Sequence, residues 1–220
     1  MLATERAPRV QPVVLEGRHV RLVPLEVGHA RELLAAASGR RETYGFTMVP
    51  SDEPSMVGYI ESALRDQEAG RALPFATIAK GTGAKATGRV VGSTRFGNIE
   101  FWPWPPGNAN QRGEDVPDAA EIGATWLAAD AQRTPINTEA KLMMLAHAFE
   151  AWRVHRVSLM TDARNERSRR AILRLGARFD GVLRAQRPGS DGTIRGTAAF
   201  SILDHEWPMV KTQLQSRLDQ

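Results

Sequence analysis

Apolar residues alternate with polar or small residues in several short stretches of the chain, which is the pattern of half-buried β-strands. The stretches that predict strands are Leu15–Leu25, Phe75–Lys80, Arg89–Ile99, Ala119–Ala128, Arg156–Thr161, Arg178–Arg184 and Thr193–Leu203. The glycine-rich residues Gly81–Gly88 predict a hairpin turn between the second and third strands, and Pro188–Gly192 predicts a turn between the last two.

Five further stretches place apolar residues three and four positions apart, which predicts amphipathic helices. They are Glu26–Ala37, Ser51–Ala69, Thr138–Arg153, Asn165–Leu175 and Glu206–Leu218. The second of these begins with a capping residue, acids and an early proline, and glycines at positions 70 and 176 follow two helix ends. Ser38–Pro50 and Glu100–Pro117 carry neither period and predict irregular loops.

The order of these elements predicts a mixed α/β (α+β) fold with a mainly antiparallel sheet. The long helix Thr138–Arg153 separates two strands, as a crossover connection does, so the strands at 119–128 and 156–161 are expected to pair in parallel. We expect one domain over residues 15–220, preceded by an N-terminal extension of residues 1–14.

Composition narrows the possible chemistry. The chain has 220 residues, of which 42% are hydrophobic, and it contains no cysteine, which excludes disulfides, thiolate metal sites and cysteine nucleophiles. We expect no metal site. The first residues lack the continuous apolar segment of a signal peptide, and no run approaches the roughly 20 apolar residues of a membrane span. A cytoplasmic protein without membrane association is therefore expected.

The net charge of +4 suits an anionic partner, and the positive charge is densest in one short segment. Its arginines are Arg164, Arg167, Arg169, Arg170 and Arg174. They could bind a phosphorylated ligand, or they could form an ordinary solvated helix face. The segment lacks the interleaved aromatic residues and motifs of nucleic-acid-binding proteins, so nucleic acid is not favoured as a partner.

Two strand–loop–helix units could carry a site. The first joins the strand at 122–127 to the helix at 138–153, and a helix N-terminus is a natural seat for phosphate groups. The second joins the strand at 156–161 to the helix at 165–175. Asn165 and Ser168 lie one turn apart there and could both face a cleft, or Asn165 could simply cap the helix with Ser168 incidental.

Both units lie in one run, EIGATWLAADAQRTPINTEAKLMMLAHAFEAWRVHRVSLMTDARNERSRRAILRLGA. This run resembles the core of the GNAT acetyltransferase superfamily, and within it the RimJ/RimL branch of ribosomal-protein N-terminal acetyltransferases. The segments LEGRHVRLVPLEVGHA, VVGSTRF and GTAAFSILDHEWPMV resemble other parts of the same fold, so the resemblance runs from about Leu15 to Leu218. It implies a sheet whose fourth and fifth strands splay apart.

The resemblance implies that acetyl-CoA is the cosubstrate and lies between the splayed strands, with its pyrophosphate on the loop at 132–138. The residues it places at the cofactor are Ala124, Thr125, Trp126, Leu127, Gln132, Arg133, Thr134, Ile136, Asn137, Thr138, Asn165 and Arg170. It places Ser168 as a proton donor to the departing thiolate and Glu121 as the general base for the attacking amine. His147, His155 and Tyr44 are weaker candidates, and Trp102 and Trp104 could help to shape the acceptor site.

The phosphate loop departs from the family pattern. Relatives read Gln/Arg-x-x-Gly-x-Gly/Ala, whereas this chain has Pro135 and Asn137 at the two small positions. The sequence therefore predicts an N-acetyltransferase that moves acetyl to a primary amine, on a protein N-terminus or a small molecule, by direct attack in a ternary complex. The alternative is a CoA-binding module with weak or no catalysis. A homodimer is a further expectation from the relatives.

Overall fold

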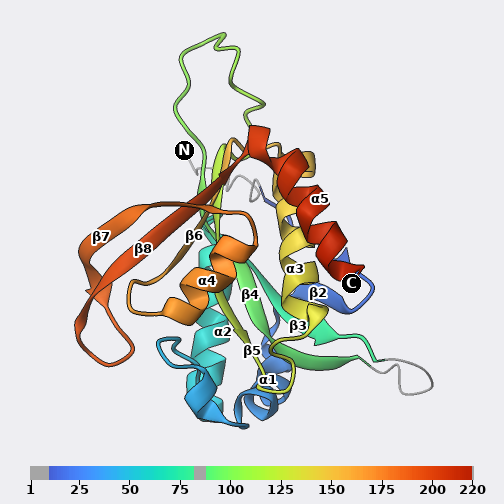
Figure 1. The fold of residues 1–220 in the computed structure, drawn as a ribbon, viewed down its shortest axis with the longest axis vertical. Coiled ribbons are helices and arrows are strands. Elements are labelled where there is room, and N and C mark those ends of the chain that lie inside the picture. The colour runs from blue at the N-terminus through green and yellow to red at the C-terminus, as the bar shows by residue number, and fades with distance from the viewer. Residues whose placement is uncertain (1–9, 82–87, 220) are drawn as a thin grey trace, which may run out of the picture.

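The computed structural model describes residues 10–81 and 88–219, so most of the hairpin turn expected at Gly81–Gly88 lies outside the described residues. Eight strands form one sheet in the order β1-β2-β3-β4-β5-β6-β8-β7 (Figure 1). The strands are β1 (Leu15–Glu16), β2 (Val20–Pro24), β3 (Leu73–Ala79), β4 (Arg89–Glu100), β5 (Ala119–Leu127), β6 (Arg156–Asp162), β7 (Arg178–Pro188) and β8 (Ile194–Leu203). All neighbours pair antiparallel except β5 and β6, which confirms the predicted mixed sheet and its parallel pair.

Helices cover both faces of the sheet. They are α1 (Ala30–Ala37), α2 (Glu53–Glu68), α3 (Pro135–Ala146), α4 (Glu166–Arg174) and α5 (Trp207–Leu218). Neighbouring residues of a strand point to opposite faces. In β4, Ser93 bonds to Tyr59 of α2, while Thr94 bonds to Lys141 of α3. The first two helices therefore lie on one face, and Figure 1 shows α3, α4 and α5 together on the other.

The first predicted strand, Leu15–Leu25, is in fact two short strands. The carboxylate of Glu139 in α3 accepts the backbone N–H groups of Arg18, His19 and Val20, at 2.8, 2.6 and 2.9 Å. These amides turn towards the helix, so the strand is interrupted. The helix expected from Glu26 likewise begins as a 3₁₀ turn, Val27–His29, before α1.

The crossover helix α3 begins at Pro135, three residues before the expected Thr138. Thr134 is its N-cap, and the hydroxyl accepts the N–H of Ile136 at 3.4 Å. Proline is favourable at the first helical position, because its fixed φ suits the helix. At the other end the helix continues as a π-helical segment, His147–Trp152, and stops at Arg153 in a left-handed conformation.

Strand ends also differ from the sequence prediction, and β3 begins at Leu73, two residues before the expected Phe75. Strand β7 continues to Pro188, four residues past Arg184, and nearly all of its residues are exposed. An exposed strand has no buried face, so alternation does not mark its end. Strand β6 includes Asp162. The remaining helices agree with their predicted positions to within a few residues, and Gly176 follows α4 with φ of +95°.

The predicted loop between β4 and β5 folds back onto the sheet end. Asp118 is buried and accepts hydrogen bonds from the backbone of Trp102 at 2.7 Å and from the indole of Trp104 at 2.6 Å. His155 stacks on Trp102 with the ring planes 9° apart. The loop lines an open pocket of about 250 Å³ beside Trp102 and Trp104.

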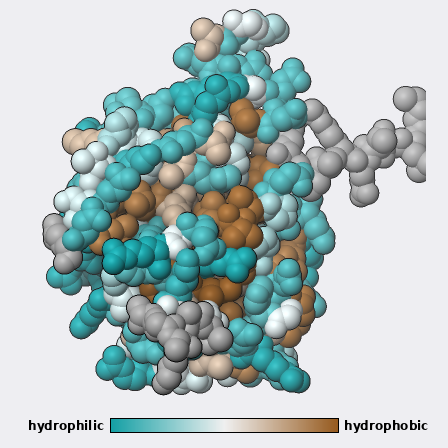
Figure 2. Space-filling model, turned by 90° about the vertical axis from the view of Figure 1, so that its right-hand side faces the viewer, coloured by the Kyte–Doolittle hydropathy of each residue, from teal (hydrophilic) through white to brown (hydrophobic). Residues whose placement is uncertain are grey.

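The core lies on both sides of the sheet. Its largest fully buried side chains include Phe75, Phe96, Phe200, Leu22, Leu33, Met56, Ile60, Met144 and Leu145. Val10, within the stretch expected as an extension, is also buried. Figure 2 shows the side that carries α5 and β2, where hydrophobic atoms gather near the middle and hydrophilic atoms surround them. Within the described residues, no helix has the length and apolar character to cross a membrane.

Candidate active site

Strands β5 and β6 separate shortly after they meet. Their parallel pairing comprises three residue pairs, from Ala119 opposite Arg156 to Glu121 opposite Ser158. The later residues of both strands have no partner across this boundary among the pairings of the described residues. The expected splay between these strands is therefore present, and Glu121 marks its narrow end.

A β-bulge in β5 lies beside the opening. Pairing with β4 passes from Arg95 opposite Gly123 to Ser93 opposite Trp126, so Ala124 and Thr125 together face Thr94. Ala124 is exposed and has φ of +47°, in the left-handed region. The bulge turns one expected cofactor residue, Ala124, towards solvent and the next, Thr125, towards α3.

The other two expected cofactor residues of β5 have buried side chains. Trp126 packs edge-on against Tyr44 with ring centroids 6.1 Å apart, and Leu127 is 8% exposed. Only their backbone groups can face a ligand. Tyr44 is itself buried, and burial raises the pKa of its hydroxyl, so it fits a structural role better than an acceptor-side role.

Lys141 of α3 lies directly below the bulge and was not expected at the site. It is 4% exposed, and its ammonium group donates to the hydroxyls of Thr94 at 2.8 Å and Thr125 at 2.7 Å. Burial lowers the pKa of Lys141 to about 7. The helical spacing could have indicated that Lys141 is buried, because it precedes the buried residues Met144 and Leu145 by three and four positions on one helix face.

The side chain of Gln132 anchors the loop at 132–138, which the sequence predicted to bind the pyrophosphate. Its amide nitrogen donates to the carbonyl of Leu127 at 2.9 Å and to the Thr43 hydroxyl at 3.1 Å. Its amide oxygen accepts from Arg167 of α4 at 2.6 Å, and Arg167 also donates to the Thr43 carbonyl. The loop, α4 and the segment after α1 are therefore joined at one point.

The rest of the loop leads into the first turn of α3. Arg133 is exposed with φ of +62°. Ile136 is buried, while Asn137 and Thr138 are half-buried within the helix. The first amides of a helix have no intrahelical acceptor, but Pro135 at the first position has no N–H to offer. The amides of Ile136 and Asn137 are therefore the remaining helical donors of this turn, and that of Ile136 already donates to the Thr134 hydroxyl at 3.4 Å.

The capping interpretation of α4 is confirmed. Asn165 is the N-cap, and its side-chain oxygen accepts the N–H of Ser168 at 3.0 Å. Both residues are half-buried. Arg170 is exposed and donates to the carbonyl of Glu166 at 3.3 Å, so the structure places it on the helix surface. The N-terminus of α4 follows β6 at the wide part of the splay.

Glu121 lies on the sheet face that α2 partly covers. Asn98 donates to its carboxylate at 2.7 Å. The pairing of Gly97 with Glu121 places Arg95 on this face too, where Asp66 of α2 lies 3.7 Å from its guanidinium group. The half-buried Glu121 and Ser158, opposite one another, therefore form part of an open surface at the narrow end of the splay.

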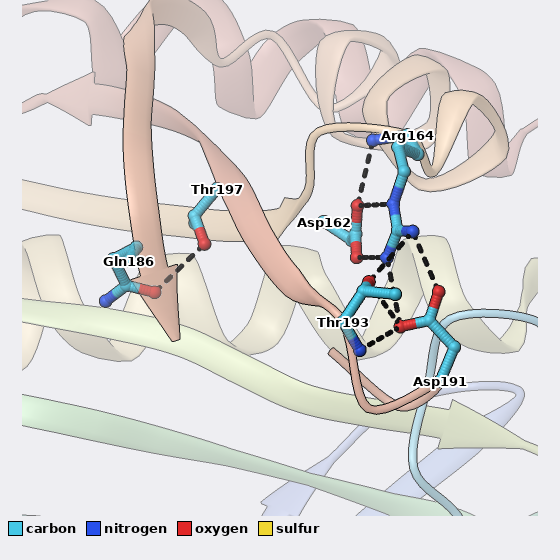
Figure 3. Close-up of polar contacts among 6 residues, drawn as sticks. All are labelled: Asp162, Arg164, Gln186, Asp191, Thr193 and Thr197. Atoms are coloured by element: carbon cyan, nitrogen blue, oxygen red, sulfur yellow. Dashed lines mark hydrogen bonds and ion pairs between the residues drawn. The ribbon is translucent and has the colours of Figure 1, made fainter. Parts of the chain in front are cut away.

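A cluster of polar contacts centred on Arg164 lies where β6 ends (Figure 3). Arg164 binds the buried carboxylate of Asp162 at 2.8 Å and that of Asp191 in the β7–β8 turn at 2.8 Å. These bonds hold the pKa of both carboxyl groups below their usual range. Arg164 also lies over the ring of Phe46, with 4.7 Å to the centroid. The cluster thus joins the β6–α4 loop to the hairpin.

Neither weaker histidine candidate lies at the splay. His147 contacts Phe96 and Trp152 in the core, and burial lowers its pKa. His155 stacks with Trp102 and bonds to the carbonyl of Asn110 at 3.0 Å. Both fit structural roles, as their surroundings are ring packing and loop anchoring.

Residues 19–178 match the family model described as an acetyltransferase (GNAT) domain, which spans the splay, the bulge and both helix N-termini. The chain belongs to the GNAT acetyltransferase family. No curated protein matches this GNAT chain significantly.

Solved structures agree with the family assignment. A GCN5-related N-acetyltransferase from Brucella melitensis is 30% identical, with a TM-score of 0.75 over 96% of this chain and 88% of that one. RimJ from Mycobacterium smegmatis, solved in complex with CoA-disulfide, is 21% identical, with a TM-score of 0.74 over 96% and 97% of the two chains. The second likeness shows that the two proteins share the GNAT fold.

Proposed function

We propose that this GNAT protein transfers acetyl from acetyl-CoA to a primary amine. The observation that carries the proposal is the splay of β5 and β6, which opens beside an exposed bulge and between the N-termini of α3 and α4. Backbone groups that lack partners line such a gap, and two helix N-termini favour an anionic ligand there.

The residues present fit acetyl-CoA, with one backbone amide fewer in the loop than relatives have. The exposed bulge at Ala124 offers backbone groups to a pantetheine arm. The amide of Asn137 and the amide of Ile136, which is held by a long bond of 3.4 Å to Thr134, offer donors to a pyrophosphate. Arg133, exposed at the loop, adds positive charge next to them. Pro135 removes one amide from the cradle, which is consistent with weaker binding than in relatives with glycine there.

Each reacting proton has a candidate residue. Acetyl-CoA would supply the acetyl group as a thioester. Glu121 would accept the proton that the acceptor ammonium loses, so that its nitrogen can attack the acetyl carbon. Ser168 would donate a proton to the sulfur as the carbon–sulfur bond breaks, and the second proton that the nitrogen loses as the amide forms would restore the Ser168 hydroxyl. Backbone N–H groups of β5 would stabilise the negative charge that develops on the acetyl oxygen.

The proposed acceptor is a class of compound, a primary amine. The fold shared with RimJ supports a protein N-terminus and the RimJ/RimL branch, while a small-molecule amine is the other candidate. A cytoplasmic location and one catalytic domain over residues 15–220 belong to the same proposal. A homodimer stays an expectation from relatives.

The second candidate function is a CoA-binding protein without efficient turnover, which Pro135 and Asn137 favour. Isothermal titration with acetyl-CoA, beside a thiol-release assay over peptides and small amines, separates the two. Tight binding with no thiol release across the panel would reject the enzyme and leave the binding module.

We expect Ser168→Ala to lower kcat about a hundredfold, because a general acid typically contributes at least this factor. Affinity for acetyl-CoA should stay within a factor of two to three, since the capping bond to Asn165 uses the backbone N–H of Ser168 and survives. Steady-state kinetics with titration calorimetry measure both quantities. An unchanged kcat would remove Ser168 from the mechanism.

We expect Glu121→Gln to lower kcat/KM for the amine about a hundredfold at neutral pH, with recovery at alkaline pH, where the free amine needs no base. Asn98 can still bond to the amide, so the local structure should persist. The pH–rate profile tests this. Equal losses at pH 7 and pH 9.5 would show that Glu121 does not accept the proton.

A further inference from the structure

Lys141 is a buried cation in the middle of α3 without a carboxylate partner. Among the salt bridges of residues 10–81 and 88–219, none includes it. Within the described residues its ammonium group bonds to the hydroxyls of Thr94 and Thr125, which lie 2.8 Å from each other and form a triangle with its nitrogen. A buried ammonium group costs stability unless surrounding groups compensate for it. We therefore expect Lys141 to have a function that offsets this cost.

The triangle supports the β5 bulge from below. Thr125 is the second bulge residue, and Thr94 is the single residue that faces the bulge from β4. The Thr125 hydroxyl also lies 3.3 Å from the carbonyl of Gly123, the residue before the bulge. Hydrogen bonds thus connect both sides of Ala124, whose left-handed φ of +47° costs an alanine about 1 kcal/mol.

We infer that Lys141 is a positioning residue that fixes the β5 bulge, so that the backbone of Ala124–Leu127 faces the gap where the acyl-pantetheine arm binds. The inference rests on the proposed function, because it assumes that acetyl-CoA occupies this gap. Lys141 does not touch the ligand. It acts through Thr125, whose hydroxyl it binds, and through Thr94, which holds the neighbouring strand in register.

Two ligands separate this role from a general effect on the protein. Acetyl-CoA would contact both the bulge and the phosphate loop, whereas adenosine 3′,5′-bisphosphate lacks the pantetheine arm and would contact only the loop. In Lys141→Met the affinity for acetyl-CoA should fall about three- to tenfold, the equivalent of roughly one net hydrogen bond. Affinity for the bisphosphate should not change. Titration calorimetry measures both constants.

A second comparison tests whether Lys141 acts through its partner. Thr125→Val alone should weaken acetyl-CoA binding. The double variant, with both Lys141→Met and Thr125→Val, should have no lower affinity than the single variant with the lower affinity, since both changes break one hydrogen-bond network. Lys211→Met is the matched control, because Lys211 is on α5, partly exposed and paired with Glu150. It should leave both affinities unchanged.

Three results would overturn the inference. The first is acetyl-CoA binding by Lys141→Met that is as tight as in the wild type. The second is an equal loss of affinity for both ligands, and the third is full additivity of Lys141→Met and Thr125→Val. If the wild type binds no acetyl-CoA, the proposed function fails and the inference fails with it. If the wild type binds but Lys141→Met binds equally well, only the inference fails.

Discussion

The stability of the wild-type protein relative to Lys141→Met is expected to rise by about 5 kcal/mol in total between pH 7 and pH 10.5. Burial lowers the pKa of Lys141 from 10.5 to about 7, because the folded core disfavours the charged form. Each pKa unit corresponds to about 1.4 kcal/mol. In this window the unfolded chain holds the proton and the folded chain has released it, so rising pH favours folding.

Below pH 7 both states carry the proton, and the cost of the buried charge is fully present. Methionine has a similar length without the charge, so the variant should be more stable than the wild type there. Urea unfolding at intervals between pH 6 and pH 9.5 measures the difference, which should change by about 1.4 kcal/mol per unit above pH 7. Lys211→Met, which alters a partly exposed side chain, should give a curve parallel to the wild type.

This result also bears on the role of Lys141. A lysine kept for stability alone would make Lys141→Met both less stable and weaker in binding at pH 6.5. A positioning residue predicts a variant that is more stable and yet binds acetyl-CoA less well, which is the usual trade-off at functional sites. Parallel stability curves for wild type and variant would show that Lys141 titrates normally.

Glu139→Ala is expected to destabilise the protein by about 4 kcal/mol. The carboxylate is 7% exposed and accepts three successive backbone N–H groups, those of Arg18, His19 and Val20. Hydrogen bonds to a charged group contribute more than neutral ones, and the buried amide of Val20, left without its acceptor, adds a desolvation cost. The change also frees the β1–β2 loop from α3.

Thermal unfolding should show a decrease in Tm of about 10 °C, on the scale of roughly 2–4 °C per kcal/mol for a chain of this size. Glu139→Gln keeps one acceptor oxygen and the side-chain volume, so it should lose less. Glu68→Ala changes an exposed glutamate of α2 and serves as the control. A loss below 1 kcal/mol in Glu139→Ala would show that water replaces the carboxylate at these amides.

Hydrophobic periodicity predicted the elements that contribute several buried residues to the core. Strands β4, β5 and β8 and helix α2 lie close to their predicted positions for this reason. Where the predicted boundary of an element was wrong, a single contact in the structure sets the true one. The break after Glu16 comes from Glu139, more than a hundred residues away, and no local pattern could reveal it. The early start of α3 was readable, because proline commonly occupies the first helical position.

The sequence predicted only those parts of the candidate site that its resemblance to the GNAT family implies. The splay is present where the sequence placed it, and Asn165 caps α4. The bulge at Ala124 was not predicted, since a single extra residue leaves the alternation of a short strand almost unchanged. Lys141 was missed because lysine is normally an exposed residue.

The short ladder between β5 and β6 has a mechanical consequence. Three residue pairs join these strands, whereas seven join β6 to β8. A pulling force applied across the sheet would meet little hydrogen-bond resistance between β5 and β6, and separation there would leave two multi-stranded sheets, β1–β5 and β6–β8. A molecule that bridges these two strands would add attachment where only three pairs hold the two parts together, so its binding should raise the rupture force.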